Sequence, residues 1–298
     1  MAKPFLKWAG GKRQLLSEIE GRLPEDIDKY STYVEPFVGG GSVMFHLLGK
    51  CNFDNVHISD LNWELVNCYK SIKSDVERVS NNLNKMIREF PDNKEERKEV
   101  YYTIRSLWNK NANREDKLSL NQRCQRAAQT IFLNKTCFNG LFRLNSMGEF
   151  NVPMGDYDTP SFPSKEALIE VHEVLQKVSI HHSSFESCSK WVDENTFVYF
   201  DPPYRPLSKT SHFVSYSKAD FNDEDQERLA TLFRKLDQKG ARLLLSNSDP
   251  KNTNPDDSFF DELYSGFNID RVFAKRSINS KPLKRGKITE LLIHNMTK

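Results

Sequence analysis

The stretch TYVEPFVGGGSV, residues 32–43, joins an apolar run of strand formers to three glycines and then to the helix-forming MFHLLG. A second short strand is predicted in NVHISDLN (55–62), and it ends at Asp60. Strand, glycine turn, helix, strand and acid is the order of a nucleotide-binding βαβ unit. Asp60 follows the glycines by roughly 20 residues, the usual interval for an acid that binds ribose hydroxyls. The stretch predicts an α/β protein with a Rossmann-like sheet.

The glycine turn also limits the kind of ligand. PFVGGGSV is not G-x-G-x-x-G, and it lacks the Lys-Ser/Thr pair of a phosphate-binding loop. Without an adjacent basic residue, the turn suits a neutral or zwitterionic nucleoside better than a pyrophosphate. S-adenosylmethionine is such a ligand.

A third strand is predicted in NTFVYF, and it runs into the sequence DPPY at 201–204. Two consecutive prolines remove two backbone donors and fix φ, so the strand must stop there. In a doubly wound sheet this end lies at the same carboxyl edge as the glycine turn. Taken alone, DPPY also fits a strand that is simply terminated by proline.

The DPPY turn suits chemistry at an amine that is conjugated to an aromatic ring. Such an amine is a poor nucleophile, because its lone pair is delocalised. The Asp201 carboxylate and the Pro202 carbonyl could accept its two hydrogens and free the lone pair for attack on a methyl sulfonium, a form of electrostatic preorganisation. Tyr204 offers a ring for the base to stack on. A base inside a duplex would have to be flipped out to reach this turn.

Composition excludes several classes of protein. The 298 residues include 28% charged and 38% hydrophobic side chains, as in ordinary globular proteins. No apolar run approaches the ~20 residues of a membrane span, and the N-terminus lacks the apolar region of a signal peptide. The five cysteines are scattered and never in C-x-x-C spacing, which favours a cytoplasmic location and predicts neither disulfides nor a metal site.

Charge is distributed unevenly although the net charge is only +2. The stretch 275–287 carries six basic residues and no acid, and the stretch 105–143 carries eight basic residues against two acids. Such stripes suit a polyanion that is contacted at chosen places, and each taken alone is also compatible with a solvated face.

The middle of the chain has a different character. Residues 76–159 are polar and mostly helical, and they end in GLFRLNSMGEFNVP, where Ser146-Met147-Gly148 indicates a β-hairpin over 139–153. The α/β alternation then returns. We therefore expect a discontinuous catalytic domain, 1–75 and 160–298, with a mostly helical target-recognition domain, 76–159, inserted into it.

Five motifs in order resemble the Dam family of DNA adenine-N6 methyltransferases (D12 class, alpha group). They are FLKWAGGK (5–12), EPFVGGGSV (35–43), DLN (60–62), FNGLFRLN…GEFNVPMG (138–155) and DPPY (201–204). The resemblance spans nearly the whole chain. It implies a Rossmann-like S-adenosylmethionine-dependent methyltransferase sheet with an inserted recognition domain, and an adenine-specific DNA methyltransferase that yields S-adenosylhomocysteine.

The resemblance also implies roles for single residues. The catalytic residues would be Asp201, Pro202 and Tyr204. The cofactor-binding residues would be Trp8, Lys12, Phe37, Gly39, Gly41, Asp60, Ser184, Phe185 and Asp201. Without the resemblance, Trp8 could be a core aromatic, Lys12 a solvated charge and Ser184-Phe185 an ordinary strand end.

For DNA, the resemblance points to the hairpin and its surroundings. The residues implied are Lys7, Phe138, Asn139, Leu141, Arg143, Pro153 and Tyr157. Leu141 and Arg143 match positions that contact the outer base pairs of GATC, and arginine is the natural bidentate partner of guanine. Phe138 and Asn139 would fill the space left by the flipped base and bind the neighbouring phosphate. Asp156 departs from the pattern, because relatives often carry a basic residue there.

Other functions remain open at this stage. A non-catalytic DNA-binding module would need the basic stripes and the hairpin but not the glycine turn, Asp60 or DPPY. A methyltransferase for RNA or protein amides could use a similar turn, but it has no use for base-edge contacts. A cytosine-N4 enzyme, or an adenine enzyme for another short site, is closer still. The expected partner is double-stranded DNA, bound by a monomer, with a cognate restriction endonuclease as a possible companion; no membrane and no metal are expected.

Overall fold

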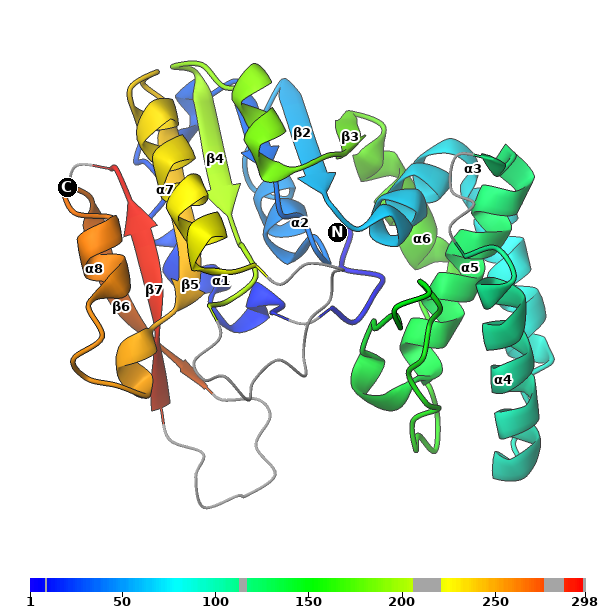
Figure 1. The fold of residues 1–298 in the computed structure, drawn as a ribbon. Helices are drawn as coiled ribbons and strands as arrows, with labels where there is room; N and C mark the ends of the chain where they lie inside the picture. The colour runs from blue at the N-terminus through cyan, green and yellow to red at the C-terminus, as the bar shows by residue number, and fades with distance from the viewer. Residues whose placement is uncertain (9, 113–116, 206–220, 276–286, 297–298) are drawn as a thin grey trace.

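The computed structural model describes residues 1–8, 10–112, 117–205, 221–275 and 287–296 (Figure 1). The predicted basic stretch 275–287 lies largely outside the described residues, as does Arg114 of the other stretch.

The centre of the protein is one seven-stranded sheet in the order β3-β2-β1-β4-β5-β7-β6 (Figure 1). Its strands are β1 (Thr32–Glu35), β2 (Asn55–Asp60), β3 (Val178–His182), β4 (Thr196–Phe200), β5 (Arg242–Ser248), β6 (Asn268–Lys275) and β7 (Lys287–His294). The first five are parallel, and β7 pairs antiparallel with both β5 and β6. This arrangement confirms the predicted α/β, Rossmann-like methyltransferase sheet.

Helices cover both faces of the sheet. The α-helices are α1 (Leu16–Glu20), α2 (Ser42–Leu48), α3 (Trp63–Arg88), α4 (Lys94–Asn109), α5 (Leu120–Thr136), α6 (Lys165–Leu175), α7 (Asp223–Asp237) and α8 (Phe259–Leu263). Short 3-10 helices are η1 (Lys12–Gln14), η2 (Ile27–Lys29), η4 (Phe138–Gly140), η5 (Phe185–Lys190) and η7 (Pro250–Asn252).

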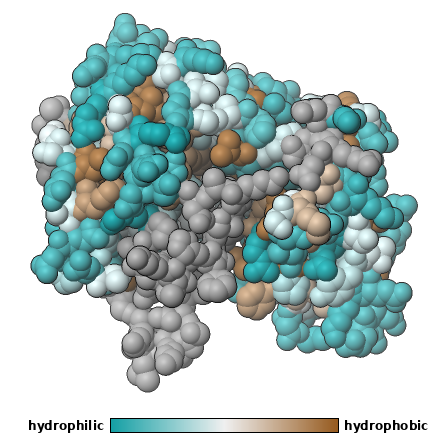
Figure 2. All heavy atoms as spheres, viewed as in Figure 1, coloured by the Kyte–Doolittle hydropathy of each residue, from teal (hydrophilic) through white to brown (hydrophobic). Residues whose placement is uncertain are grey.

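Alternation along the central strands creates two hydrophobic cores. Phe197 and Tyr199 of β4 pack with residues of α2 and α3, whereas Val198 and Phe200 pack with residues of η5, α7 and α8. All five residues of β4 are buried, as expected for a parallel strand covered on both faces. On the face shown in Figure 2 most side chains are hydrophilic, and the apolar ones form small separate groups.

The polar helix α5 packs against the long helix α3, and α4 packs against α5, beside the sheet (Figure 1). Helix α3 is interrupted at Asp75, whose φ of −155° and ψ of 74° are not helical. A buried ion pair joins the two helices α3 and α5: Arg126 Nη2 lies 2.6 Å from Glu64 Oε1, and the guanidinium stacks on Trp108 of α4 at 3.9 Å. Whether 76–159 is a separate inserted domain stays a prediction.

The segment predicted as a hairpin, 139–153, follows α5. Its arms pair antiparallel at Leu144 and Phe150, and again at Cys137 and Met154, as isolated bridges rather than as two regular strands. The Gly148 amide donates to the Asn145 carbonyl at 2.9 Å, and Gly148 has a φ of 77°. A residue without a side chain is therefore favoured at the tip.

One element of the sheet was not predicted from the sequence. Strand β6, NIDRVFAK, lies at the edge of the sheet and pairs only with β7. Its charged residues obscure the alternation that marks a strand. Within the described residues, no helix is both long and apolar enough to cross a membrane.

Candidate active site

Four parallel strands, β2, β1, β4 and β5, bring their carboxyl ends to one edge of the sheet. The glycine turn follows β1, Asp60 ends β2, and DPPY follows β4. These predicted groups come from distant parts of the sequence, from Gly39 to Tyr204, and the strand order places them side by side. Ligands of open α/β sheets bind at such an edge.

The glycine turn is held by its neighbours. The Gly39 amide donates to Asp60 Oδ2 at 3.1 Å, and the Tyr69 hydroxyl donates to the Gly39 carbonyl at 3.0 Å. Gly41 has a φ of 72°, and a methyl group on it would lie 2.6 Å from the Tyr69 hydroxyl oxygen. A side chain at Gly41 is therefore excluded both by backbone conformation and by space.

An aromatic group borders the turn. The rings of Phe37 and Phe185 stack with centroids 5.3 Å apart, and Phe221 meets both edge-on, at 5.7 and 5.8 Å. Ser184 precedes Phe185 and its hydroxyl donates to Glu186. Phe221 lies two residues before the start of α7, and no motif of the sequence points to it.

The Asp201 carboxylate is bound by two donors through a single oxygen. Lys12 Nζ lies 2.6 Å from Oδ1, and the Ser246 hydroxyl donates to the same atom at 3.2 Å. Ser246 in turn shares a hydrogen bond of 2.8 Å with the Tyr199 hydroxyl. Among the described residues no hydrogen bond to Oδ2 is found, so this oxygen is the one left to accept an incoming hydrogen.

The rest of the DPPY turn is fixed as well. The Gln226 amide of α7 donates to the Pro203 carbonyl at 3.2 Å, and its oxygen accepts from Asn247 at 3.3 Å. The Tyr204 hydroxyl donates to Glu290 Oε2 at 2.6 Å, and Lys12 Nζ lies 4.6 Å from the centre of the Tyr204 ring. Gln226 and Asn247 are fully buried, which makes this support rigid.

Burial raises the pKa of three acids at the site. Burial raises the pKa of Asp201, and the Lys12 ammonium and the Ser246 hydroxyl oppose that shift. Burial also raises the pKa of Asp60, against the hydrogen bonds from the Asn62 and Gly39 amides. Burial holds the pKa of Glu35 well above its usual range, although the Tyr33 hydroxyl donates to it at 2.6 Å.

The predicted DNA residues lie on the surface around the base of the hairpin. Phe138 is 50% exposed, and Asn139, Arg143 and Pro153 are exposed, whereas Leu141 is half-buried. Asn139 has a φ of 55°, which is rare for a residue with a side chain and is often found at functional sites. The Arg143 guanidinium donates from Nε to Asn151 at 2.8 Å.

Lys7, Tyr157 and Asp156 lie at the other side of the hairpin base. Lys7 Nζ is 4.4 Å from the centre of the Tyr157 ring. Asp156 pairs with Lys94 Nζ at 2.7 Å, which lowers the pKa of Asp156. The acid that departs from the family pattern is therefore neutralised by a neighbouring lysine.

These groups fit S-adenosylmethionine. The glycine turn offers close approach to backbone, the Asp60 carboxylate keeps acceptor capacity beyond its two amide bonds, and the rings of Phe37 and Phe185 provide flat apolar faces. Within the described residues no group of three His, Cys, Asp or Glu side chains could hold a metal ion.

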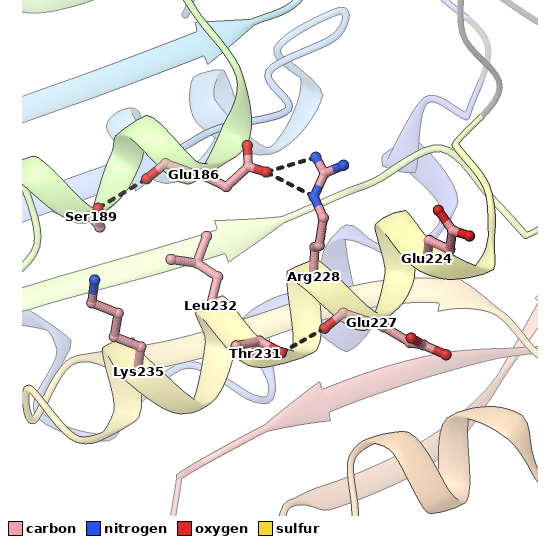
Figure 3. Close-up of a pocket in the computed structure, with 8 residues that line it drawn as sticks. All are labelled: Glu186, Ser189, Glu224, Glu227, Arg228, Thr231, Leu232 and Lys235. Atoms are coloured by element: carbon pink, nitrogen blue, oxygen red, sulfur yellow. Dashed lines mark hydrogen bonds and ion pairs between the residues drawn. The ribbon is translucent and has the colours of Figure 1, made fainter.

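A hollow of about 540 Å³ lies between η5 and α7 (Figure 3). Arg228 in its wall donates to Glu186 at 2.7 Å (Figure 3), and its guanidinium lies 5.5 Å from the centre of the Phe185 ring. No predicted site residue lines the hollow.

Comparison with known proteins assigns the family. The model of the D12 class N6 adenine-specific DNA methyltransferases matches residues 8–278. The chain belongs to this family. It is 52% identical over 297 residues to the type II methyltransferase M.MjaIII of Methanocaldococcus jannaschii, covering 98% of this chain and 99% of that protein. It is 40% identical to the type II methyltransferase M1.LlaDCHI of Lactococcus lactis subsp. cremoris (98% and 95% covered) and 34% identical to the DNA adenine methylase of Escherichia coli K12 (97% and 94% covered).

Membership of the D12 class confirms the resemblance stated from the motifs and makes the protein an adenine-specific DNA methyltransferase. It also implies S-adenosylmethionine as the methyl donor. The residue roles within this D12 enzyme remain predictions. The supports Ser246, Gln226 and Glu290 were missed. A signal existed for Ser246, because LLLSNS (243–248) places polar residues at the end of a buried strand, but none pointed to Gln226 or Glu290.

Proposed function

We propose that the protein methylates N6 of an adenine flipped out of duplex DNA, within the sequence GATC. The observation that carries the proposal is the Asp201 carboxylate, held by Lys12 and Ser246 through Oδ1 and open at Oδ2, beside the glycine turn. Both elements of a methyl transfer to an amine, an acceptor for its hydrogens and a site for the donor, thus lie at one sheet edge.

Trp8, Lys12, Phe37, Gly39, Gly41, Asp60, Ser184 and Phe185 would surround the donor. When bound, S-adenosylmethionine supplies a methyl group on a sulfonium sulfur; its transfer to N6 leaves the bonding pair on sulfur as S-adenosylhomocysteine and releases one proton.

The protein's own part is to bind and orient the amine. Asp201 Oδ2 accepts one amino hydrogen and the Pro202 carbonyl accepts the other, so the lone pair is no longer shared with the ring. Tyr204 stacks on the base, and its bond to Glu290 fixes the ring. Removing one such preorganised group typically costs ~3–4 kcal/mol of transition-state stabilisation.

Recognition of GATC is proposed for the exposed residues around the hairpin. Arg143 would donate to guanine O6 and N7, a contact worth ~1–3 kcal/mol of discrimination. Leu141 would contact the same outer base pairs, with Pro153 beside it. Phe138 would occupy the space of the flipped base, and Asn139 would bind a phosphate. Lys7 and Tyr157 would act at the first base pair.

We also propose that one protein molecule acts on DNA alone, because the same chain carries the cofactor site and the recognition hairpin. Two of the relatives are named type II methyltransferases. This suggests a companion endonuclease for the same site, and with it a role in restriction and modification in the cytoplasm.

The test is transfer of labelled methyl groups from S-adenosylmethionine into a panel of short duplexes. The panel contains GATC, every single-base substitution of it, and a matched RNA duplex. Transfer to GATC alone is expected. Equal transfer to substituted sites would remove GATC from the proposal, and transfer to RNA but not to DNA would overturn it.

A further inference from the structure

The N-terminal segment, with Lys7 and Trp8, lies between the glycine turn (39–41) proposed for the cofactor and the turn 138–140 proposed for DNA. In Figure 1 it passes, in dark blue, between the sheet and the green region of α5 and the hairpin. On the sheet side, methyl groups on Gly39 and Gly40 would lie 3.2 and 3.1 Å from atoms of Trp8. On the hairpin side, the Trp8 ring lies 5.5 Å from that of Phe142. Trp8 is therefore packed between the two proposed binding sites.

Lys7, one residue earlier, packs closely on the DNA-contacting turn 138–140. Gly140 has a φ of 66°, and a methyl group on it would lie 2.6 Å from Cβ of Lys7. The backbones of the two segments thus approach more closely than residues with side chains on both would permit. A shift of Lys7 must move this turn as well.

One buried side chain holds these backbones together. Asn134, in the last turn of α5, is 1% exposed. Its Oδ1 accepts from the Lys7 amide at 2.7 Å, and its Nδ2 donates to the Lys7 carbonyl at 2.7 Å and to the Gly140 carbonyl at 2.9 Å. Three of its four hydrogen-bonding positions are used, all on backbone groups of the two segments.

No role in catalysis or direct DNA contact explains this arrangement, because the Asn134 side chain is buried and, in the part of the chain that the structure describes, bonds only to backbone groups. We infer that Asn134 is a positioning residue that couples cofactor binding to DNA binding. Cofactor that orders the glycine turn and Trp8 also fixes Lys7, and through Asn134 it fixes Gly140 and its neighbours Phe138 and Asn139. The inference rests on the proposed function, since it assumes a cofactor at the turn and DNA at residues 138–140.

Coupling of this kind is reciprocal. It can be measured as the ratio of two dissociation constants for DNA, the one without cofactor product divided by the one with it. The dissociation constant of a fluorescein-labelled GATC duplex is determined by anisotropy, with and without saturating S-adenosylhomocysteine, at one salt concentration. For the wild type we expect the cofactor product to tighten DNA binding about fivefold or more, the lower end of common coupling ratios. For Asn134→Ala we expect a ratio below about twofold.

The matched control is Thr136→Val. Thr136 lies in the same helical turn, is 1% exposed, and its hydroxyl donates only to carbonyls of its own helix. This variant should keep the wild-type ratio. If Asn134→Ala does not fold, Asn134→Ser replaces it, because a serine hydroxyl is too short to reach both Lys7 and Gly140. The ratio of the serine variant should fall in the same way.

A wild-type ratio near 1, or an unchanged ratio in the Asn134 variants, would overturn the inference. Its failure can be told from failure of the proposed function by two further measurements on the wild type, binding of S-adenosylhomocysteine alone and methyl transfer to the duplex. If both are normal while the Asn134 variants keep full coupling, only the role of Asn134 is refuted. If the wild type transfers no methyl group to DNA, the proposed function fails first.

Discussion

Ser246→Ala is the most informative single change at the candidate active site. It removes one of the two donors on Asp201 Oδ1 and leaves Lys12 in place. Ser246 touches neither of the proposed ligands. Its effect on the reaction should therefore act through the orientation and charge of the Asp201 carboxylate, while the loss of its hydrogen bond with Tyr199 should appear in the stability of the protein.

The size of the effect follows from the geometry. A hydrogen bond to a charged group contributes ~1.5–3 kcal/mol, and the 3.2 Å between Ser246 and Asp201 favours the lower end. A loss of about 1.4 kcal/mol from transition-state stabilisation reduces kcat/KM about tenfold. Tyr199→Phe acts one bond further away, so its effect should be smaller.

The pKa of Asp201 also predicts the direction in which the pH profile of Ser246→Ala should move. Burial raises the pKa of Asp201, and the Ser246 hydrogen bond lowers it. Without Ser246 the pKa of Asp201 rises further, so the acid limb of kcat/KM moves to higher pH. The groups around Asp201 that stay unchanged are Lys12, Glu35 and Glu290. The deficit of the variant should accordingly be largest at low pH and shrink as pH rises.

The assay is methyl transfer to a GATC duplex under kcat/KM conditions from mildly acidic to alkaline pH. Ser80→Ala is the control, because Ser80 is 1% exposed in α3 and bonds only to Asn84. Wild-type rates with an unmoved acid limb in Ser246→Ala would refute the role given to this hydrogen bond. If kcat/KM falls by the same factor at every pH, the loss of Ser246 changes the orientation of the Asp201 carboxylate and not its pKa.

Three further predictions concern the DNA surface and the helical part. Arg143→Ala should reduce discrimination at one base pair by ~1–3 kcal/mol, seen as relaxed kcat/KM across substituted duplexes rather than uniformly weaker binding. Glu64→Gln leaves the buried Arg126 guanidinium uncompensated, and urea unfolding should show a loss of ~3–5 kcal/mol; a loss below about 1 kcal/mol would contradict this. Asp156→Asn removes the closer of the two carboxylates beside Lys94 and leaves Asp158 at 3.8 Å, so Lys94 is more available to a phosphate, DNA affinity should increase and its dependence on salt should steepen by up to about one unit of slope. An unchanged slope would exclude Lys94 from the DNA contacts.

The sequence was sufficient to predict elements and candidate site residues where one short stretch carries both a secondary-structure pattern and chemically suitable residues. Strand β1, the glycine turn and Asp60 follow each other within 30 residues, and their order has few other structural solutions. The two prolines of DPPY fix the end of β4 in the same local way. Strand β6 was missed because an edge strand tolerates charged residues, so its period is weak.

The supports of the active site could not be predicted, because they depend on strand order. Ser246 and Glu290 lie 45 and 86 residues from their partners Asp201 and Tyr204. Only the strand order, with β5 beside β4 and β7 beside β5, brings them together. Lys12 was assigned to the cofactor loop, and its 2.6 Å contact with Asp201 became visible only in the structure. Sequence pattern identifies the reacting groups more readily than the groups that hold them.

The central claim is that the Asp201 turn methylates adenine N6, and nucleoside analysis tests it most directly. Wild type and Asp201→Ala are incubated with S-adenosylmethionine and a GATC duplex, the DNA is digested, and modified nucleosides are quantified by mass spectrometry, with S-adenosylhomocysteine binding checked in both proteins. We expect N6-methyladenine from the wild type and none from Asp201→Ala, which should still bind S-adenosylhomocysteine. N4-methylcytosine from the wild type, or substantial N6-methyladenine from Asp201→Ala, would contradict the account.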